Sequence, residues 1–256
     1  MKPYILAEIG SNYRISDNQD DNLICALKHI HAAKECGCDC AKFQYYTHEK
    51  LYGIPGDDTY AMPQKWLQKL AAECRKIGID FMVSVFDPAD VALVDPYVKM
   101  HKIACSENNY SELIKAVSDT KKEYFVSLQA NTQYIEDDPK FNPMLCVPKY
   151  PALLSDYNII RHIQSWGCLS AISDHTTNND LAIICASRGC IYFEKHFRLD
   201  DITNTPDAEV SICPTQMQKY IRSIKDVCAA ISEYKYYDNP HQRRHLSHRF
   251  YRKKYN

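Results

Sequence analysis

The sequence predicts a single (β/α)₈ barrel, and three observations support this fold class. Short β-rich runs alternate with longer amphipathic runs, the alternation gives eight units, and 256 residues is a usual length for one such barrel. Regular strand-then-helix order implies parallel strands, and eight units imply closure. The alternative, an open doubly wound sheet, predicts a Gly-rich phosphate loop after the first strand, and this sequence has none there.

The first half of the chain shows the alternation clearly. Residues 4–9 (YILAEI) and 40–45 (CAKFQY) are β-rich and predict strands, whereas residues 21–36 place apolar side chains at helical spacing. Residues 63–78 predict a helix that a proline opens and a glycine closes. The next expected elements are a strand at 80–86, a helix near 88–95, a strand at 98–104, a helix near 110–118 and a strand at 124–128.

Residues 129–142 (QANTQYIEDDPKFN) interrupt this rhythm. The segment is polar and short, so we expect the fifth helix to be reduced or absent. The remaining expected elements are strands at 144–147, 169–173 and 190–197, and helices near 156–166, 179–188 and at 214–232. The barrel domain is therefore expected to span residues 1–237. Residues 238–256 form a basic tail, which is typical of a solvated extension or of a segment that contacts a partner chain.

The composition limits the class of partner. A formal net charge of -1 gives no global reason to expect nucleic acid or a membrane as a partner, so any anion site is expected to be local. No apolar run approaches membrane-spanning length, and Glu8 interrupts the one stretch that resembles a signal sequence. We therefore expect a cytoplasmic, reduced protein. Its twelve cysteines lie mostly in apolar runs, and we interpret Cys36, Cys38 and Cys40 as buried hydrophobes, with a zinc site as the alternative.

Two histidines are expected at the ends of neighbouring strands. Side chains two residues apart in a strand share a face, so Ser173 shares one with His175, and Glu194 with His196. Active sites of such barrels lie at the carboxyl ends of the strands. Two imidazoles there, with oxygen or water completing the coordination, suit a labile Mn²⁺, Mg²⁺ or Co²⁺ better than a structural zinc. The alternative is that each histidine is a hydrogen-bonded polar residue at the barrel rim.

Two lysines lie within otherwise apolar strands. A buried cation is costly unless it meets an anion, so Lys42 and Lys102 predict an anionic ligand. Pairing with Glu8, Glu107 or Glu194 is the alternative. Serines also end three strands, and together with the lysines they favour a phosphate site: Ser84, Ser127 and Ser173.

These residues lie within motifs that resemble one enzyme family, the sialic acid synthases with their legionaminic and pseudaminic acid relatives. The most specific matches are ISDHT (172–176) and FEKHF (193–197). The other matching segments are collinear with them: LAEIGSN (6–12), GCDCAKFQ (37–44), SVFD (84–87), KIACSENN (102–109), CVPKYP (146–151) and TPD (205–207).

The resemblance implies a barrel enzyme that condenses phosphoenolpyruvate with an N-acetylmannosamine-like aldehyde sugar, giving a nonulosonic acid and phosphate. It implies that His175 and His196 bind a divalent metal, with Mn²⁺ favoured, which polarises the aldehyde oxygen. The implied catalytic residues are Glu8, Glu107 and Glu194. The implied substrate-binding residues are Lys42, Gln44, Ser84, Lys102, Ser106, Ser127, Tyr150, Ser173 and Asp207.

The sequence also departs from the family pattern. Tyr13 and Val85 replace a histidine and a threonine, SLQA (127–130) replaces STGM, and the C-terminal antifreeze-like domain has no counterpart here. In the family that domain contributes an arginine to a partner's sugar site, so a homodimer or a separate chain is expected to complete the site. Two alternatives to an active synthase remain open. One is a non-catalytic barrel that binds a sugar or a partner, and the other is a synthase for a phosphorylated acceptor, for which no second basic pocket is evident outside the tail.

Overall fold

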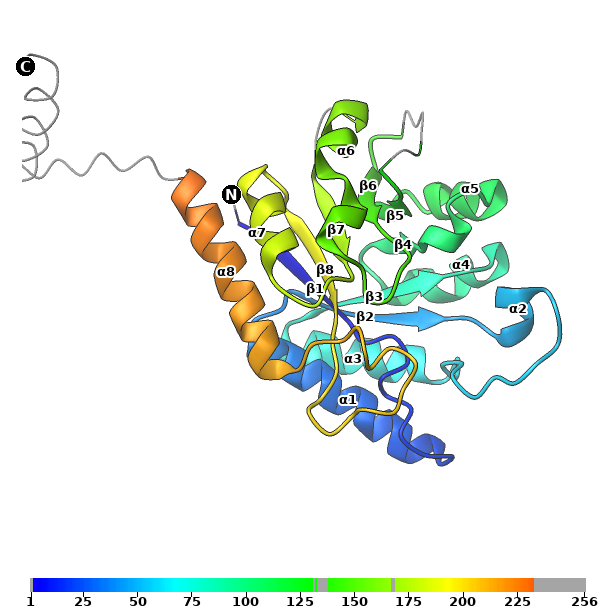
Figure 1. The fold of residues 1–256 in the computed structure, drawn as a ribbon. Helices are drawn as coiled ribbons and strands as arrows, with labels where there is room; N and C mark the ends of the chain where they lie inside the picture. The colour runs from blue at the N-terminus through cyan, green and yellow to red at the C-terminus, as the bar shows by residue number, and fades with distance from the viewer. Residues whose placement is uncertain (1, 131, 133–137, 167–168, 233–256) are drawn as a thin grey trace, which may run out of the picture.

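A computed structural model of the chain shows a closed barrel of eight parallel strands with helices outside it (Figure 1). The structure describes residues 2–130, 132, 138–166 and 169–232. Strands pair in chain order, and β1 pairs with β8 to close the ring. The predicted fold class is therefore confirmed. The basic tail lies outside the described residues.

The strands are β1 (Tyr4–Glu8), β2 (Cys40–Tyr45), β3 (Asp80–Val85), β4 (His101–Ile103), β5 (Tyr124–Leu128), β6 (Phe141–Cys146), β7 (Ala171–Asp174) and β8 (Tyr192–His196). The helices are α1 (Gln19–Cys36), α2 (His48–Tyr52), α3 (Trp66–Ile77), α4 (Pro88–Val94), α5 (Ser111–Asp119), α6 (Ile159–Trp166), α7 (Asp180–Ser187) and α8 (Pro214–Ser232). Short 3₁₀ segments occur at η1 (Asp95–Tyr97), η2 (Cys105–Glu107) and η3 (Leu154–Tyr157).

Three elements differ from the sequence-based prediction. β4 is shorter because residues 98–100 form a bend after η1, and the ladder with β3 begins only at His101. β6 begins earlier because Phe141 pairs with Tyr124, although a polar residue and a proline follow it. The short helix α2 was not predicted, and Thr47 and Gly53 cap it at its two ends. The helix expected to be reduced is the one after β5, at residues 129–142, of which 131 and 133–137 lie outside the described part of the chain.

Apolar side chains form two separate layers around the strands. A large outer cluster packs between the strands and the helices, and it includes Cys36 and Cys38. A small inner cluster fills the lower part of the barrel: Leu6, Cys40, Met82, Met100, Phe125, Met144 and Ala171. The burial of these three cysteines agrees with their interpretation as small hydrophobes.

Polar side chains lie inside the barrel next to the inner cluster, nearer the carboxyl ends of the strands. Because side chains two residues apart point the same way, each inner apolar residue is followed on its own strand by another inward side chain nearer the carboxyl end. These seven followers are mostly polar: Glu8, Lys42, Ser84, Lys102, Ser127, Cys146 and Ser173. These seven side chains, here called the polar ring, lie directly on the carboxyl-terminal side of the apolar inner cluster. Among the described helices, none is both long and apolar enough to cross a membrane.

Candidate functional site

A cavity of about 350 Å³ opens above the polar ring, at the carboxyl ends of the strands. The structure brings together twelve of the fourteen predicted site residues along its walls: Glu8, Lys42, Gln44, Ser84, Lys102, Ser106, Ser127, Tyr150, Ser173, His175, Glu194 and His196. Glu107 and Asp207 do not line it. Glu107 accepts a hydrogen bond from Ser106 (2.6 Å), and Asp207 lies 4.0 Å from Nδ1 of His196 and accepts two hydrogen bonds from Ser11.

The two imidazoles converge in this cavity. His175 follows β7, His196 ends β8, and their ring centroids are 5.3 Å apart. Nδ1 of His175 donates to the carbonyl of Val147 (2.6 Å), which leaves Nε2 without a proton and able to accept. Nδ1 of His196 has no hydrogen-bond partner among the described residues. Burial lowers the pKa of both histidines, that of His175 to about 3, so both rings are neutral near pH 7.

These two imidazoles fit an open metal site. Neutral imidazole is the form that binds a metal ion, and a ligand histidine commonly donates its other ring N–H to a backbone carbonyl, as His175 does. Within the described ranges, no three or more His, Cys, Asp or Glu side chains form a metal-holding group. The donor set is thus two nitrogens, and water or substrate oxygens would complete the coordination.

Lys42 is enclosed by two carboxylates. Its ammonium pairs with Glu8 and lies 3.3 Å from Glu194, and all three side chains are buried. Burial lowers the pKa of Lys42 to about 8, with Glu194 opposing that shift. For Glu194, burial raises the pKa, but the charges of Lys42 and Lys102 outweigh burial and bring it to about 2. Glu194 is therefore ionised at neutral pH, and its other oxygen accepts a hydrogen bond from Ser173 (2.7 Å).

Lys102 differs from Lys42 because none of the described carboxylates pairs with it. Its ammonium donates to the hydroxyl of Ser127 (2.7 Å) and to the carbonyl of Ile103 (3.0 Å). No acidic side chain of the described residues lies within ion-pair distance of it, and Lys102 is only 2% exposed. A buried ammonium with only neutral partners is costly. An anionic ligand in the cavity would supply the missing negative charge.

Sequence reasoning missed several residues of the cavity wall. Gln129 lies two residues beyond Ser127 but one residue past the end of β5, so alternation would identify it only if the strand pattern were extended beyond Leu128. Cys105 and Cys146 also line the wall, and neither was among the predicted site residues. A hydrogen bond from the thiol of Cys146 lowers the pKa of Cys105 to about 7, and nearby Lys102 adds to that effect. No sequence pattern predicted this contact, because Cys105 lies in η2 and Cys146 lies two strands away.

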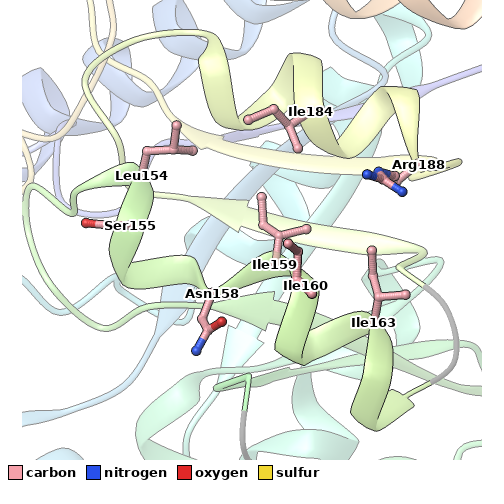
Figure 2. Close-up of a pocket in the computed structure, with 8 residues that line it drawn as sticks. All are labelled: Leu154, Ser155, Asn158, Ile159, Ile160, Ile163, Ile184 and Arg188. Atoms are coloured by element: carbon pink, nitrogen blue, oxygen red, sulfur yellow. The ribbon is translucent and has the colours of Figure 1, made fainter.

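A larger cavity of about 570 Å³ lies elsewhere, between η3, α6 and α7 (Figure 2). Isoleucines of α6 and α7 face one another across it, and Arg188 is its single charged lining residue. None of the predicted site residues lines this cavity. Its size does not make it the reactive centre, because it lacks groups that could activate a substrate. The smaller polar cavity has those groups.

The fold and the polar cavity together define a class: a (β/α)₈ barrel with a polar cavity at the carboxyl ends of the strands, in which two lysines lie near two neutral imidazoles. Comparison with known proteins narrows the class. A family described as the NeuB family matches residues 29–236. The chain belongs to this family.

Individual relatives agree with that assignment. The chain is 28% identical to a pseudaminic acid synthase of Helicobacter pylori over 264 residues, covering 90% of this chain and 76% of the relative. It is 24% identical to the human N-acetylneuraminate-9-phosphate synthase, covering 89% of this chain and 71% of that protein. A crystal structure of an N-acetylneuraminic acid (sialic acid) synthetase from Leptospira borgpetersenii superposes with a TM-score of 0.79 at 20% identity, covering 97% of this chain and 92% of the other, and it supports the fold.

Proposed function

We propose that this chain condenses phosphoenolpyruvate with the open-chain aldehyde of an N-acetylmannosamine-like sugar, releasing phosphate and forming a nonulosonic acid. The observation that supports this most directly is the buried ammonium of Lys102, which shares one cavity with the paired imidazoles and has no carboxylate partner among the described residues. The relatives that are synthases of pseudaminic and N-acetylneuraminic-type acids support the same reaction class.

Phosphoenolpyruvate would bind on the Lys102 side of the cavity. Lys102 and Ser127 are already joined by a hydrogen bond and offer a cation and a hydroxyl to a phosphate or a carboxylate. Ser84 and Gln44 add neutral donors on the neighbouring strands β3 and β2. Lys42 adds positive charge but shares it with two carboxylates, so we assign the larger part of anion binding to Lys102.

The residues facing the other half of the cavity suit an aldehyde and a divalent ion. His175 and His196 would hold Mn²⁺, or Mg²⁺ or Co²⁺, which when bound supplies a Lewis acid to the aldehyde oxygen. Tyr150 stands at the mouth, 54% exposed, with its ring centroid 4.3 Å from that of His175. It would bound the space for the sugar, and Asp207 approaches from the loop after β8.

The carboxylates would orient the polar side chains around the reacting atoms. Glu8 and Glu194 hold Lys42 between them, and Glu194 stays ionised, so it would hold both the Lys42 ammonium and the Ser173 hydroxyl in place. Burial raises the pKa of Glu107, which reaches the cavity through its hydrogen bond with Ser106. We therefore place Glu107 as a supporting group and Glu194 nearest the reacting atoms.

One observation favours the alternative of a non-catalytic binding barrel. Lys42 already forms ion pairs with Glu8 and Glu194 without any ligand, so part of the polar ring has its charged partners. A sugar-binding barrel without chemistry is compatible with such a self-paired site. Phosphate release separates the two proposals, because only the synthase transforms phosphoenolpyruvate.

The test is phosphate release from phosphoenolpyruvate with Mn²⁺ and a panel of N-acetylated aldehyde sugars. We expect release with at least one acceptor, and a loss of about 10²–10³-fold in the Lys102→Met variant, the magnitude typical of removing one group that stabilises developing charge. The control is Lys122→Met, which changes a lysine paired with Asp95 near the start of β4, remote from the cavity. Phosphoenolpyruvate binding without release from any acceptor would instead favour the binding barrel.

A further inference from the structure

A buried ion pair lies on the outer side of the strands that present the two imidazoles. Asp174 and Lys195 are register partners on β7 and β8, and their charged groups are 3.2 Å apart. Asp174 is fully buried and Lys195 is 1% exposed. Each adjoins a cavity histidine in sequence, so strand alternation points it away from the cavity. Lys195 accordingly lies over the ring of Tyr220 on α8, 5.6 Å from its centroid.

The ion pair forms hydrogen bonds with Thr176, the residue that follows His175. The backbone N–H of Thr176 donates to Asp174 (2.8 Å), and the Thr176 hydroxyl donates to the same oxygen (2.7 Å). The ammonium of Lys195 donates to the carbonyl of Thr176. Both backbone polar groups of Thr176 are thus bound by one ion pair that spans two strands. None of these bonds belongs to the strand ladder, because β7 ends at Asp174.

We propose that Asp174 and Lys195 are positioning residues that lock the carboxyl end of β7 to β8 and thereby keep the imidazoles of His175 and His196 convergent. This inference rests on the proposed metal role of those two histidines. We name the pair with Thr176 the β7–β8 clamp. It touches neither the cavity nor any reacting atom, so its effect on the site acts through the backbone.

Energetics favour positioning over stabilisation as the role of the clamp. Bringing two charges into a dry interior costs several kcal/mol per ion, and apolar replacement of a buried ion pair is often neutral for stability. The apolar contacts between β7 and the surrounding helices do not need these charges. What apolar side chains cannot supply is hydrogen bonding to the N–H and carbonyl of Thr176.

Hydrogen bonds outside the β7–β8 clamp also hold the backbone of His175. The His175 N–H donates to the hydroxyl of Tyr157 (2.8 Å), and that hydroxyl donates to the carbonyl of Ser173 (2.7 Å). The His175 carbonyl accepts from the N–H of Ala152 (2.9 Å). These bonds hold His175 toward η3, whereas among the described residues the clamp alone ties the following residue to β8. Loss of the clamp is therefore expected to change the spacing between the rings rather than to unfold the strand.

The experiment compares wild type with D174L/K195M, which removes both charges without leaving either one unpaired. K122M serves as the matched control, because Lys122 also pairs with an aspartate and donates to backbone carbonyls, but near the start of β4. Calorimetry measures Mn²⁺ binding and, without metal, phosphoenolpyruvate binding, and thermal unfolding gives Tm.

We expect Mn²⁺ affinity to fall about 10–100-fold in D174L/K195M, as for other groups that orient metal ligands. We expect metal-free phosphoenolpyruvate binding to stay within about twofold, and Mn²⁺ binding to be unchanged in K122M.

Amide hydrogen exchange gives a second readout that needs no metal. We expect the Thr176 amide to be protected in wild type and to exchange at least about tenfold faster in D174L/K195M, which removes the carboxylate that accepts the Thr176 N–H. Unchanged Mn²⁺ affinity in a folded double variant would overturn the clamp, and so would an unprotected Thr176 amide in wild type. Wild type that binds no Mn²⁺ would instead refute the metal role of the histidines, and the exchange data would then decide the clamp alone.

Discussion

The two lysines of the polar ring have different partners and therefore different expected roles. Lys42 sits between Glu8 and Glu194, whereas Lys102 contacts only a hydroxyl and a carbonyl within ion-pair or hydrogen-bond distance among the described residues. An ammonium held by carboxylates has less charge to offer an anion. The free energy of ligand binding should thus depend more on Lys102, and the stability of the folded protein around the polar ring more on Lys42.

Replacing each lysine by methionine tests this difference. We expect Lys102→Met to weaken phosphoenolpyruvate binding about 10–100-fold, because a charge-assisted hydrogen bond contributes about 1.5–3 kcal/mol. We expect Lys42→Met to lower the stability more than Lys102→Met, since it leaves two buried carboxylates facing each other. Calorimetry and urea denaturation measure the two effects. The reverse ranking in both measurements would contradict these roles.

Cys105 is expected to be the most reactive thiol of the described chain. Its pKa is lowered to about 7, and it is partly exposed, whereas burial raises the pKa of most other cysteines, including Cys38 and Cys185. Brief iodoacetamide treatment at pH 7 should alkylate Cys105 first, and bound phosphoenolpyruvate should slow the reaction. Peptide mass spectrometry measures the order. Cys213, also partly exposed, is the internal comparison, and its faster labelling would refute the assignment.

At the scale of the elements, α1 contains a buried histidine that couples stability to pH. Nδ1 of His29 donates to the carbonyl of Cys25 (2.8 Å), and Nε2 accepts from the N–H of Leu199 (3.4 Å). Burial lowers the pKa of His29 from 6.5 to about 4. Because the folded pKa is below the unfolded one, the unfolded chain binds this proton first as the pH falls. His29 therefore favours the folded state most above pH 6.5.

The expected consequence is a pH-dependent difference between wild type and His29→Gln. The free energy of unfolding that His29 contributes should decline by about 3 kcal/mol as the pH falls from 6.5 to 4. Urea denaturation across that range, without added metal, gives the difference between the two proteins at each pH. A constant difference throughout would show that His29 does not titrate in this way.

Strand parity explains why so much of the site was predictable from the sequence. Once a strand is recognised, alternation decides which side chains enter the barrel, and this is how Lys42, Ser173 and Glu194 were placed on the cavity wall. Parity gives no information on segments outside the strands. The location of Asp207 depends on hydrogen bonds to Ser11, nearly two hundred residues earlier. The approach of Cys105 to Cys146 likewise depends on how η2 turns inward.

At the scale of the whole molecule, closure of the sheet brings the two ends of the chain into one site. Glu8 of β1 and His196 of β8 are register partners across the closing pair, so the first strand meets the last at the cavity. An open sheet would separate them. The eight-unit alternation predicted closure, but the exact strand limits depended on neighbours, as the early start of β6 beside β5 shows.

The most direct test of the central claim is a crystal structure of the protein soaked with Mn²⁺ and phosphoenolpyruvate, with anomalous data collected for manganese. We expect one strong anomalous peak about 2.0–2.3 Å from a ring nitrogen of both His175 and His196. We also expect the phosphate or carboxylate of phosphoenolpyruvate within hydrogen-bond distance of Lys102. Manganese bound away from the two imidazoles, or phosphoenolpyruvate bound outside this cavity, would contradict the claim.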